Sequence, residues 1–278
     1  MLPEIPAEEL TACLDRAAGR LLRKAGVRAP PVDALRIAAA LGIETAIDGG
    51  QQPRARYVEL RAARGGTPRA AILLRPEPRS ERRQWAVAHE LGEREAADVF
   101  GRLSIDPRAA PPGAREWVAN QMANRILLPT RWLARAGATF GWDLMALKDR
   151  FRTASHELIL RRMLEFAPPV IVSIFDHGAL SFRRGNRGGR MALTKIEREC
   201  WHAAHSSGKT QERIVGMYSV RGWAVHEEGW KRELLRMEVA DSFDDADAGA
   251  WPLDDAETGR EWFDDGPPPD DTFDEHAT

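Results

Sequence analysis

The sequence predicts an α+β fold, and three observations lead to this prediction. Over roughly the first 166 residues, apolar side chains recur every three to four residues, which is the period of an amphipathic helix. Short strand-like segments interrupt this region near residues 43–74. From Val170 onward, the pattern changes to short β-rich segments separated by turn residues. We therefore expect helices with a small sheet, followed by a β-rich module.

The chain opens with two predicted helices and three predicted strands. The first helix covers residues 8–25, and its apolar stripe should face the core. After Pro30 and Pro31 interrupt the chain, a shorter helix covers residues 34–41 and stops at Gly42. The strand candidates are residues 43–47, 55–60 and 70–74.

Four further helices are predicted before the β-rich module. Residues 80–99 form one, with Ser80 as its cap, and residues 114–127 form the next, closed by Pro129. Residues 142–151 and 155–166 form a shorter pair, with Ser155 as the second cap. This pair is helix-turn-helix-like over about residues 141–166, and we expect Glu157 or Glu165 to be solvated.

The β-rich module begins with a predicted hairpin. Residues 170–175 and 179–182 flank a turn at Asp176, His177 and Gly178. Residues 214–220, 224–226 and 234–239 are further strand candidates, with Trp223 and Trp230 as aromatic core material. We predict three regions: a first domain at 1–166, this module at 167–240, and a tail at 241–278.

Charge is divided unevenly along the chain. The last 38 residues hold fourteen Asp or Glu and one Arg, whereas the rest holds 28 acidic and 39 basic residues. The acidic tail has few branched apolar residues and is expected to be disordered. It could lie across the basic body and compete there with an acidic ligand or DNA.

Composition excludes several classes of protein. No run of about 18 apolar residues could cross a membrane, and no leader is seen, so we expect a cytoplasmic protein. Cys13 and Cys200 are the only cysteines, which rules out a disulfide framework and a cysteine-rich zinc cluster. Any metal ligands must therefore be His, Asp or Glu.

The segment His89-Glu90-Leu91-Gly92-Glu93 lies on a predicted helix. Residues four apart on a helix are about 6 Å apart at Cβ, so His89 and Glu93 could hold one ion. Glu90 would then lie beside that ion as the general base. A hydrolytic metal site needs three protein ligands, and Glu116 on the next helix is the candidate for the third.

The segment from Glu116 to Pro129 resembles a signature of the ImmA/IrrE family of zinc-metallopeptidase-like regulators. Members pair a His-Glu-x-x-His helix with a later Glu-x-x-Ala-Asn helix that ends in Leu-Leu-x-Pro or similar. The residues that fall in register are Glu116, Ala119, Asn120, Leu127 and Pro129. The resemblance covers roughly residues 10–165 and implies a zincin-like metallopeptidase domain.

The sequence departs from the family where Glu93 replaces the second histidine. Two carboxylates and one imidazole would neutralise a divalent ion and make its water less acidic. Such a set of ligands also favours harder ions. Zn2+, Mn2+, Fe2+ and a metal-free site all remain open.

The resemblance implies a regulator that cleaves a helix-turn-helix repressor of the XRE type and so releases stress-response or mobile-element genes. A metal-free scaffold that binds such a partner without cutting it is the alternative. A DNA-binding regulator is the third hypothesis and is not favoured. Its candidate contacts are the basic loop residues Arg183, Arg184, Arg187 and Arg190.

Four other histidines are candidates for a replacement ligand. We expect His156 to be a helix-start or pocket residue and His226 to lie in a strand or turn. His202 and His205 are near Cys200, but their spacing lacks a second cysteine pair or an acidic partner. Both are therefore predicted to be surface helix residues.

Overall fold

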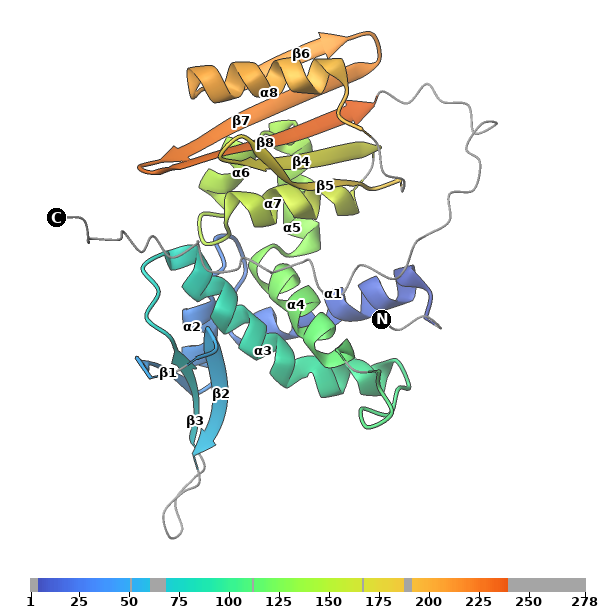
Figure 1. Ribbon diagram of the computed structural model, residues 1–278. Coiled ribbons are helices and arrows are strands. Elements are labelled where there is room, and N and C mark those ends of the chain that lie inside the picture. The colour runs from blue at the N-terminus through green and yellow to red at the C-terminus, as the bar shows by residue number, and fades with distance from the viewer. Residues whose placement is uncertain are drawn as a thin grey trace, which may run out of the picture.

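The computed structural model confirms the predicted α+β fold (Figure 1). It describes residues 5–50, 52–60, 69–111, 113–166, 168–187 and 192–239. Helices and a three-stranded sheet are followed by a five-stranded sheet with a helix across it. Across these described ranges, no helix is long and apolar enough to span a membrane. The acidic tail, residues 241–278, lies outside the described residues.

The predicted helices of the first part are present, and one more is added. They are α1 (Ala7–Lys24), α2 (Ala34–Ala40), α3 (Ser80–Arg102), α4 (Ala114–Leu127), α5 (Thr130–Phe140), α6 (Leu144–Arg150) and α7 (His156–Arg162). No helix was predicted for the residues of α5. Its N-cap is Pro129 and its C-cap is the left-handed Gly141. Ser155 caps α7 as predicted, because its hydroxyl accepts from the Leu158 N–H. The prediction for Ser80 was wrong: it is the first helical residue, and its hydroxyl donates to Glu81.

The small sheet lies against α3. Its strands are β1 (Ile43–Ile47), β2 (Ala55–Leu60) and β3 (Arg69–Leu74), in the order β1-β3-β2. The central strand β3 pairs with β1 in parallel and with β2 antiparallel. Strand β2 is therefore an edge strand, with backbone N–H and C=O groups that point away from β3.

The large sheet is wholly antiparallel, in the order β5-β4-β8-β7-β6. Its strands are β4 (Val170–Asp176), β5 (Ala179–Gly185), β6 (Gln211–Val215), β7 (Tyr218–Glu227) and β8 (Trp230–Val239). The predicted hairpin turn is confirmed, since His177 and Gly178 both have positive φ, as a tight two-residue turn requires. The predicted break between residues 220 and 224 is wrong, because β7 runs through it and the turn falls at Gly216 instead.

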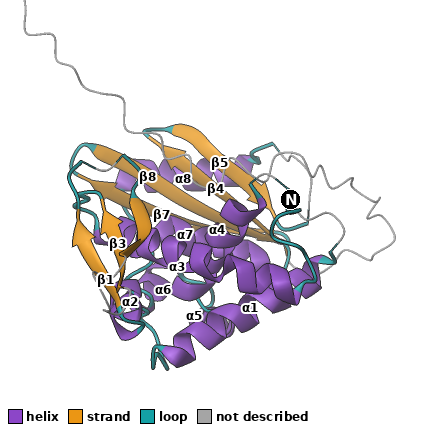
Figure 2. Cartoon of the chain, turned by 90° about the horizontal axis from the view of Figure 1, so that it is seen from below, coloured by secondary structure: helices purple, strands orange, loops and turns teal. Residues whose placement is uncertain are grey.

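Both faces of the large sheet are covered. Helix α8 (Lys195–Ser207) packs on one face, and the helices of the first part pack on the other (Figures 1 and 2). Trp223 is a core residue as predicted, and its indole N–H donates to Asp143 at 3.2 Å. Trp223 and Leu234 belong to the same apolar cluster as α1, α3 and α4. The core therefore continues across residue 166.

Two glutamates expected to be solvated are instead counter-charges for arginines. Glu165 pairs with Arg125 at 3.1 Å and with Arg162, both of which are buried. Glu157 pairs with Arg232 of β8 at 2.7 Å. Buried guanidinium groups require such partners, and the sequence did not reveal which arginines would be buried.

The predicted basic loop is only partly described. Arg183 and Arg184 lie within β5, and Arg183 forms an ion pair with the fully buried Glu197 at 2.6 Å. Arg187 is an exposed residue of the following turn, and Arg190 lies outside the described residues. Because Arg183 neutralises an internal carboxylate, it does not offer a free charge for phosphate.

Candidate metal and catalytic site

Helix α3 brings His89, Glu90 and Glu93 together. One ligand atom from each lies within 4.8 Å of the others, a separation that suits a shared metal ion. Their spacing along the sequence places them on adjacent parts of one helix surface. This surface faces α4 on one side and β2 on the other.

Gly92 allows α3 and α4 to approach closely. A Cβ added at Gly92 would lie 2.6 Å from the Ala119 carbonyl oxygen and 2.8 Å from the Met122 Cβ. These distances are far shorter than ordinary van der Waals contact. The missing side chain thus lets α4 residues reach the motif.

The orientation of His89 is fixed by Asn120 of α4. The His89 Nδ1–H donates to the Asn120 Oδ1 at 2.8 Å, and the ring also packs on Trp85. In the neutral imidazole, the lone pair is then on Nε2, which lies 3.5 Å from the Glu116 Oε2. The His89 side chain is only 12% exposed, so its orientation is well constrained. Metal-binding histidines commonly have such a partner on the second nitrogen.

Burial and neighbouring groups act in opposite directions on the pKa of His89. Burial is the largest single influence and lowers the pKa, but Glu116, Glu90 and Asn120 together raise it above its usual value. In return, His89 lowers the pKa of Glu116. The Glu116 side chain is 61% exposed, so solvent screens this pair and leaves its carboxylate accessible.

Glu90 is buried between the helix and the small sheet. Its Oε2 accepts the Tyr57 N–H of edge strand β2 at 2.7 Å. Burial raises the pKa of Glu90, and the Tyr57 hydrogen bond offsets this only in part. A carboxylate with a raised pKa is a stronger base, which suits a general base.

Glu93 is held by an arginine. The Arg115 Nε donates to the Glu93 Oε1 at 3.1 Å, and both side chains are partly exposed. Arg115 therefore provides the positive charge that a metal ion would otherwise provide. Because this pair is solvent-accessible, it is weak enough to exchange for an ion.

The structure gathers His89, Glu90 and Glu93 within 4.8 Å of one another, whereas Glu116 lies near His89 but outside that group, so a shared ion requires side chains to move. The 3.5 Å between His89 and Glu116 is close to the roughly 3.3 Å between ligands around a tetrahedral zinc with bonds of about 2.0–2.1 Å. Glu93 is within reach of His89, but its carboxylate must leave Arg115 to ligate. The sequence did not reveal the roles of Asn120, Arg115 and Tyr57. The spacing of Glu116 and Asn120, four residues apart on one helix, is a signal that could have revealed Asn120.

The other histidines lie elsewhere. His156 is the first residue of α7; burial and then Lys148 lower its pKa, and it is not among the residues gathered around His89. His205 and His226 come together with Glu233 in a second cluster within the large sheet and α8. His205 lies on helix α8 with a side chain that is 30% exposed, as predicted, but its ring also contacts the buried Glu233, an acidic partner that the spacing did not reveal.

Comparison with known proteins points to one peptidase family. The family profile described as the IrrE N-terminal-like domain matches residues 39–163. No curated protein matches the chain. A solved structure of a Mycobacterium tuberculosis transcriptional regulator is similar in fold, with a TM-score of 0.57 and 18% identity. That similarity covers 85% of this chain and 81% of the regulator.

Proposed function

Residues 39–163 place the chain in the peptidase family of IrrE N-terminal-like domains, and we therefore propose that it is a metal-dependent peptidase. Its proposed substrate is a helix-turn-helix repressor of the XRE type, whose cleavage would switch on stress-response or mobile-element genes. The solved structure that is similar in fold is described as a transcriptional regulator, which supports a regulatory role for this chain.

One observation carries the proposal. His89 is held by Asn120 so that its Nε2 lies 3.5 Å from the Glu116 carboxylate, with the buried Glu90 next to it on α3. A metal-binding histidine typically has one nitrogen fixed by a hydrogen-bond acceptor and the other directed at the ion, which is how Asn120 and Glu116 flank His89. The arrangement leaves the His89 Nε2 and the Glu116 carboxylate partly open to solvent, with Glu90 beside them as the base.

The proposed ligands are His89, Glu93 and Glu116, and the proposed catalytic residue is Glu90. A bound ion would supply Lewis-acid polarisation of a peptide carbonyl and would lower the pKa of water. Two carboxylates among the ligands favour Mn2+ or Fe2+ as well as Zn2+. The Oε2 of Glu90 is held by Tyr57, which leaves Oε1 to take a proton from attacking water and pass it to the leaving amine.

A test of the peptidase combines metal analysis with cleavage of a candidate XRE-type repressor. We expect stoichiometric metal in the purified protein, and cleavage that falls by about 10²–10⁴-fold in Glu90→Gln. Glu95→Gln is the matched control. It is the same change on the same helix, at a residue outside the group formed by His89, Glu90 and Glu93. Equal activity of Glu90→Gln and wild type would contradict the assignment of the base.

The Arg115–Glu93 pair favours a second candidate function, a metal-free regulator that binds its partner without cutting it. In that case, the natural chain would bind a repressor, hold no metal at His89 and release no fragments. Glu93→His would then create metal binding at His89 that the natural chain lacks. If the natural chain binds an ion that His89→Asn removes, this second function is excluded.

A further inference from the structure

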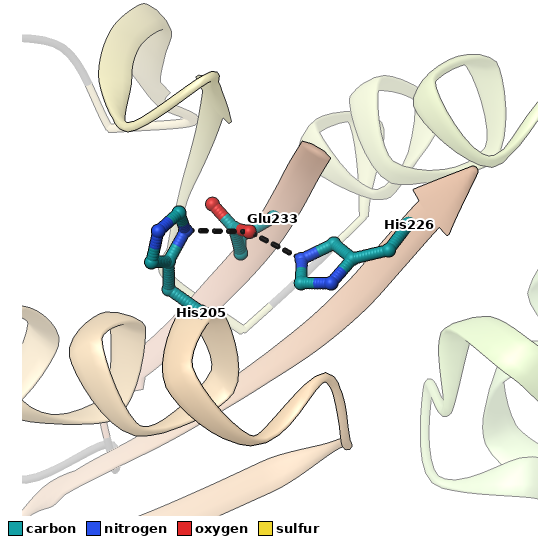
Figure 3. A group of neighbouring side chains, drawn as sticks. All are labelled: His205, His226 and Glu233. Carbon is teal, nitrogen blue, oxygen red and sulfur yellow. Dashed lines mark hydrogen bonds and ion pairs between the residues drawn. The ribbon is translucent and has the colours of Figure 1, made fainter. Parts of the chain in front are cut away.

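A second group of potential metal ligands lies between α8 and the large sheet, outside the residues that match the peptidase family. It consists of His205, His226 and Glu233, here called the C-terminal histidine cluster (Figure 3). Glu233 of β8 pairs with Ala224 of β7, and His226 is two residues further along β7. Because side chains alternate along a strand, Glu233 and His226 share a face. His205, near the end of α8, reaches the same point from above that face.

One carboxylate oxygen connects both imidazoles. The Glu233 Oε1 lies 3.0 Å from the His205 Nδ1 and 2.5 Å from the His226 Nε2. Glu233 is fully buried, whereas the His205 and His226 side chains are 30% and 22% exposed. The cluster thus has a buried anion at its base and two nitrogen ligands at an opening to solvent.

Among the described residues, neither a lysine nor an arginine forms an ion pair with Glu233. Its hydrogen-bond and ion-pair partners in the described part of the chain are His205, His226 and the Trp201 indole N–H. A buried carboxylate is costly unless it is paired or hydrogen-bonded, and three hydrogen bonds hold this one. A divalent cation at the opening would supply a positive charge.

Neighbouring groups hold the carboxylate in a defined orientation. The Trp201 Nε1–H donates to the Glu233 Oε2 at 3.1 Å, which directs Oε1 toward the histidines. Trp201 is in turn stacked on Phe175 with ring centroids 4.6 Å apart. Outer-shell hydrogen bonds of this kind commonly orient metal-binding carboxylates.

The end of α8 also favours positive charge. The helix ends at a left-handed Gly208, where a Cβ would be 3.6 Å from the His226 Nδ1. The C-terminus of a helix carries partial negative charge, which stabilises a nearby cation.

From this geometry we propose that His205, His226 and Glu233 form a binding site for a divalent transition-metal ion, with zinc as the reference ion. Two imidazoles and one carboxylate are a known zinc set that leaves a fourth position open to solvent. Ligands around such an ion are roughly 3.3 Å apart, so the present hydrogen bonds at 2.5 and 3.0 Å must open slightly. To ligate, the His205 Nδ1 and His226 Nε2 must lose the hydrogens that face Glu233, and in a neutral imidazole this hydrogen moves to the other ring nitrogen.

The site is tested in the full-length chain with the first site disabled by His89→Asn. Titration with Zn2+, or with Co2+ followed by its visible absorption, should show one bound ion per chain. His205→Asn and His226→Asn should each weaken binding at least tenfold. His202→Asn is the matched control on α8, because His202 is exposed and outside the cluster; it should leave the affinity unchanged.

The histidine variants keep the test informative even if Glu233→Gln does not fold, since both imidazoles are partly exposed. Circular dichroism confirms that each variant is folded, and Zn2+ should raise the melting temperature of the His89→Asn protein but not of its His226→Asn derivative. The proposal is overturned if no ion binds, or if binding survives loss of both His205 and His226. Either result would leave the cluster as a hydrogen-bonded part of the core.

Discussion

Replacement of Gly92 by alanine should destabilise the protein because α3 and α4 meet at this residue. The added Cβ would lie 2.6 Å from the Ala119 carbonyl oxygen, and one atom of this contact is backbone. Relative to ordinary contacts beginning near 3.4 Å, the helices must move apart by roughly 0.8 Å. Overpacking of this kind costs about 1–3 kcal/mol. The higher helix propensity of alanine offsets about 1 kcal/mol.

Taking the upper end of the overpacking cost, the net loss is about 2 kcal/mol in the free energy of unfolding. For a protein of this size, that corresponds to a fall in Tm of roughly 4–8 °C. Gly101→Ala is the matched control on the same helix, because nothing lies within 4 Å of a Cβ there. Because Gly101 lies next to the last residue of α3, helix propensity should raise Tm by no more than about 2–4 °C.

The assay is thermal unfolding of the three proteins by circular dichroism or calorimetry under identical conditions. If Gly92→Ala melts at or above the wild-type temperature, the close approach of the helices is not what requires glycine. If Gly101→Ala loses as much as Gly92→Ala, the effect belongs to the helix in general and not to the contact with α4.

Three further predictions concern individual side chains. Asn120→Ala should weaken metal binding at the first site by about 10–100-fold. Asn120→Asp keeps the acceptor for His89 and should lose less metal affinity. Equal losses of affinity would contradict the orienting role of Asn120. Burial lowers the pKa of His156, so the unfolded state binds its proton more tightly and stability should fall as pH drops through about 6.5. His156→Gln should reduce that slope in denaturant unfolding between pH 7.5 and 5.5, and an unchanged slope would refute the assignment. Burial raises the pKa of Cys200 to about 11. Its alkylation at pH 8, followed by peptide mass spectrometry, should therefore be at least about 100-fold slower in the native than in the unfolded protein. Comparable rates would argue against a buried thiol.

The sequence was most informative where one helix carries several signals. The motif around His89 and the later Glu116 helix could be read from spacing, since residues three and four apart share a helix face. The apolar stripe of α1 likewise predicted its buried face. These features depend on local periodicity, which is present in the sequence itself.

Features that depend on tertiary contact were not predictable. Arg115 could not be assigned to Glu93, because either residue alone resembles an ordinary surface charge. The C-terminal histidine cluster was not predicted for a similar reason: His205, His226 and Glu233 are on three elements, and strand register together with the packing of α8 brings them together. Knowing that β7 and β8 form a hairpin would have placed His226 and Glu233 on one face.

The core that passes between the helices and the large sheet has a consequence for cooperativity. Trp223 and Leu234 share one apolar cluster with α1, and the family match at residues 39–163 includes none of these three. The family match therefore covers a shorter stretch of chain than the apolar core requires. A fragment cut to the matched residues would expose apolar surface at both of its ends, whereas the whole chain should unfold in a single transition.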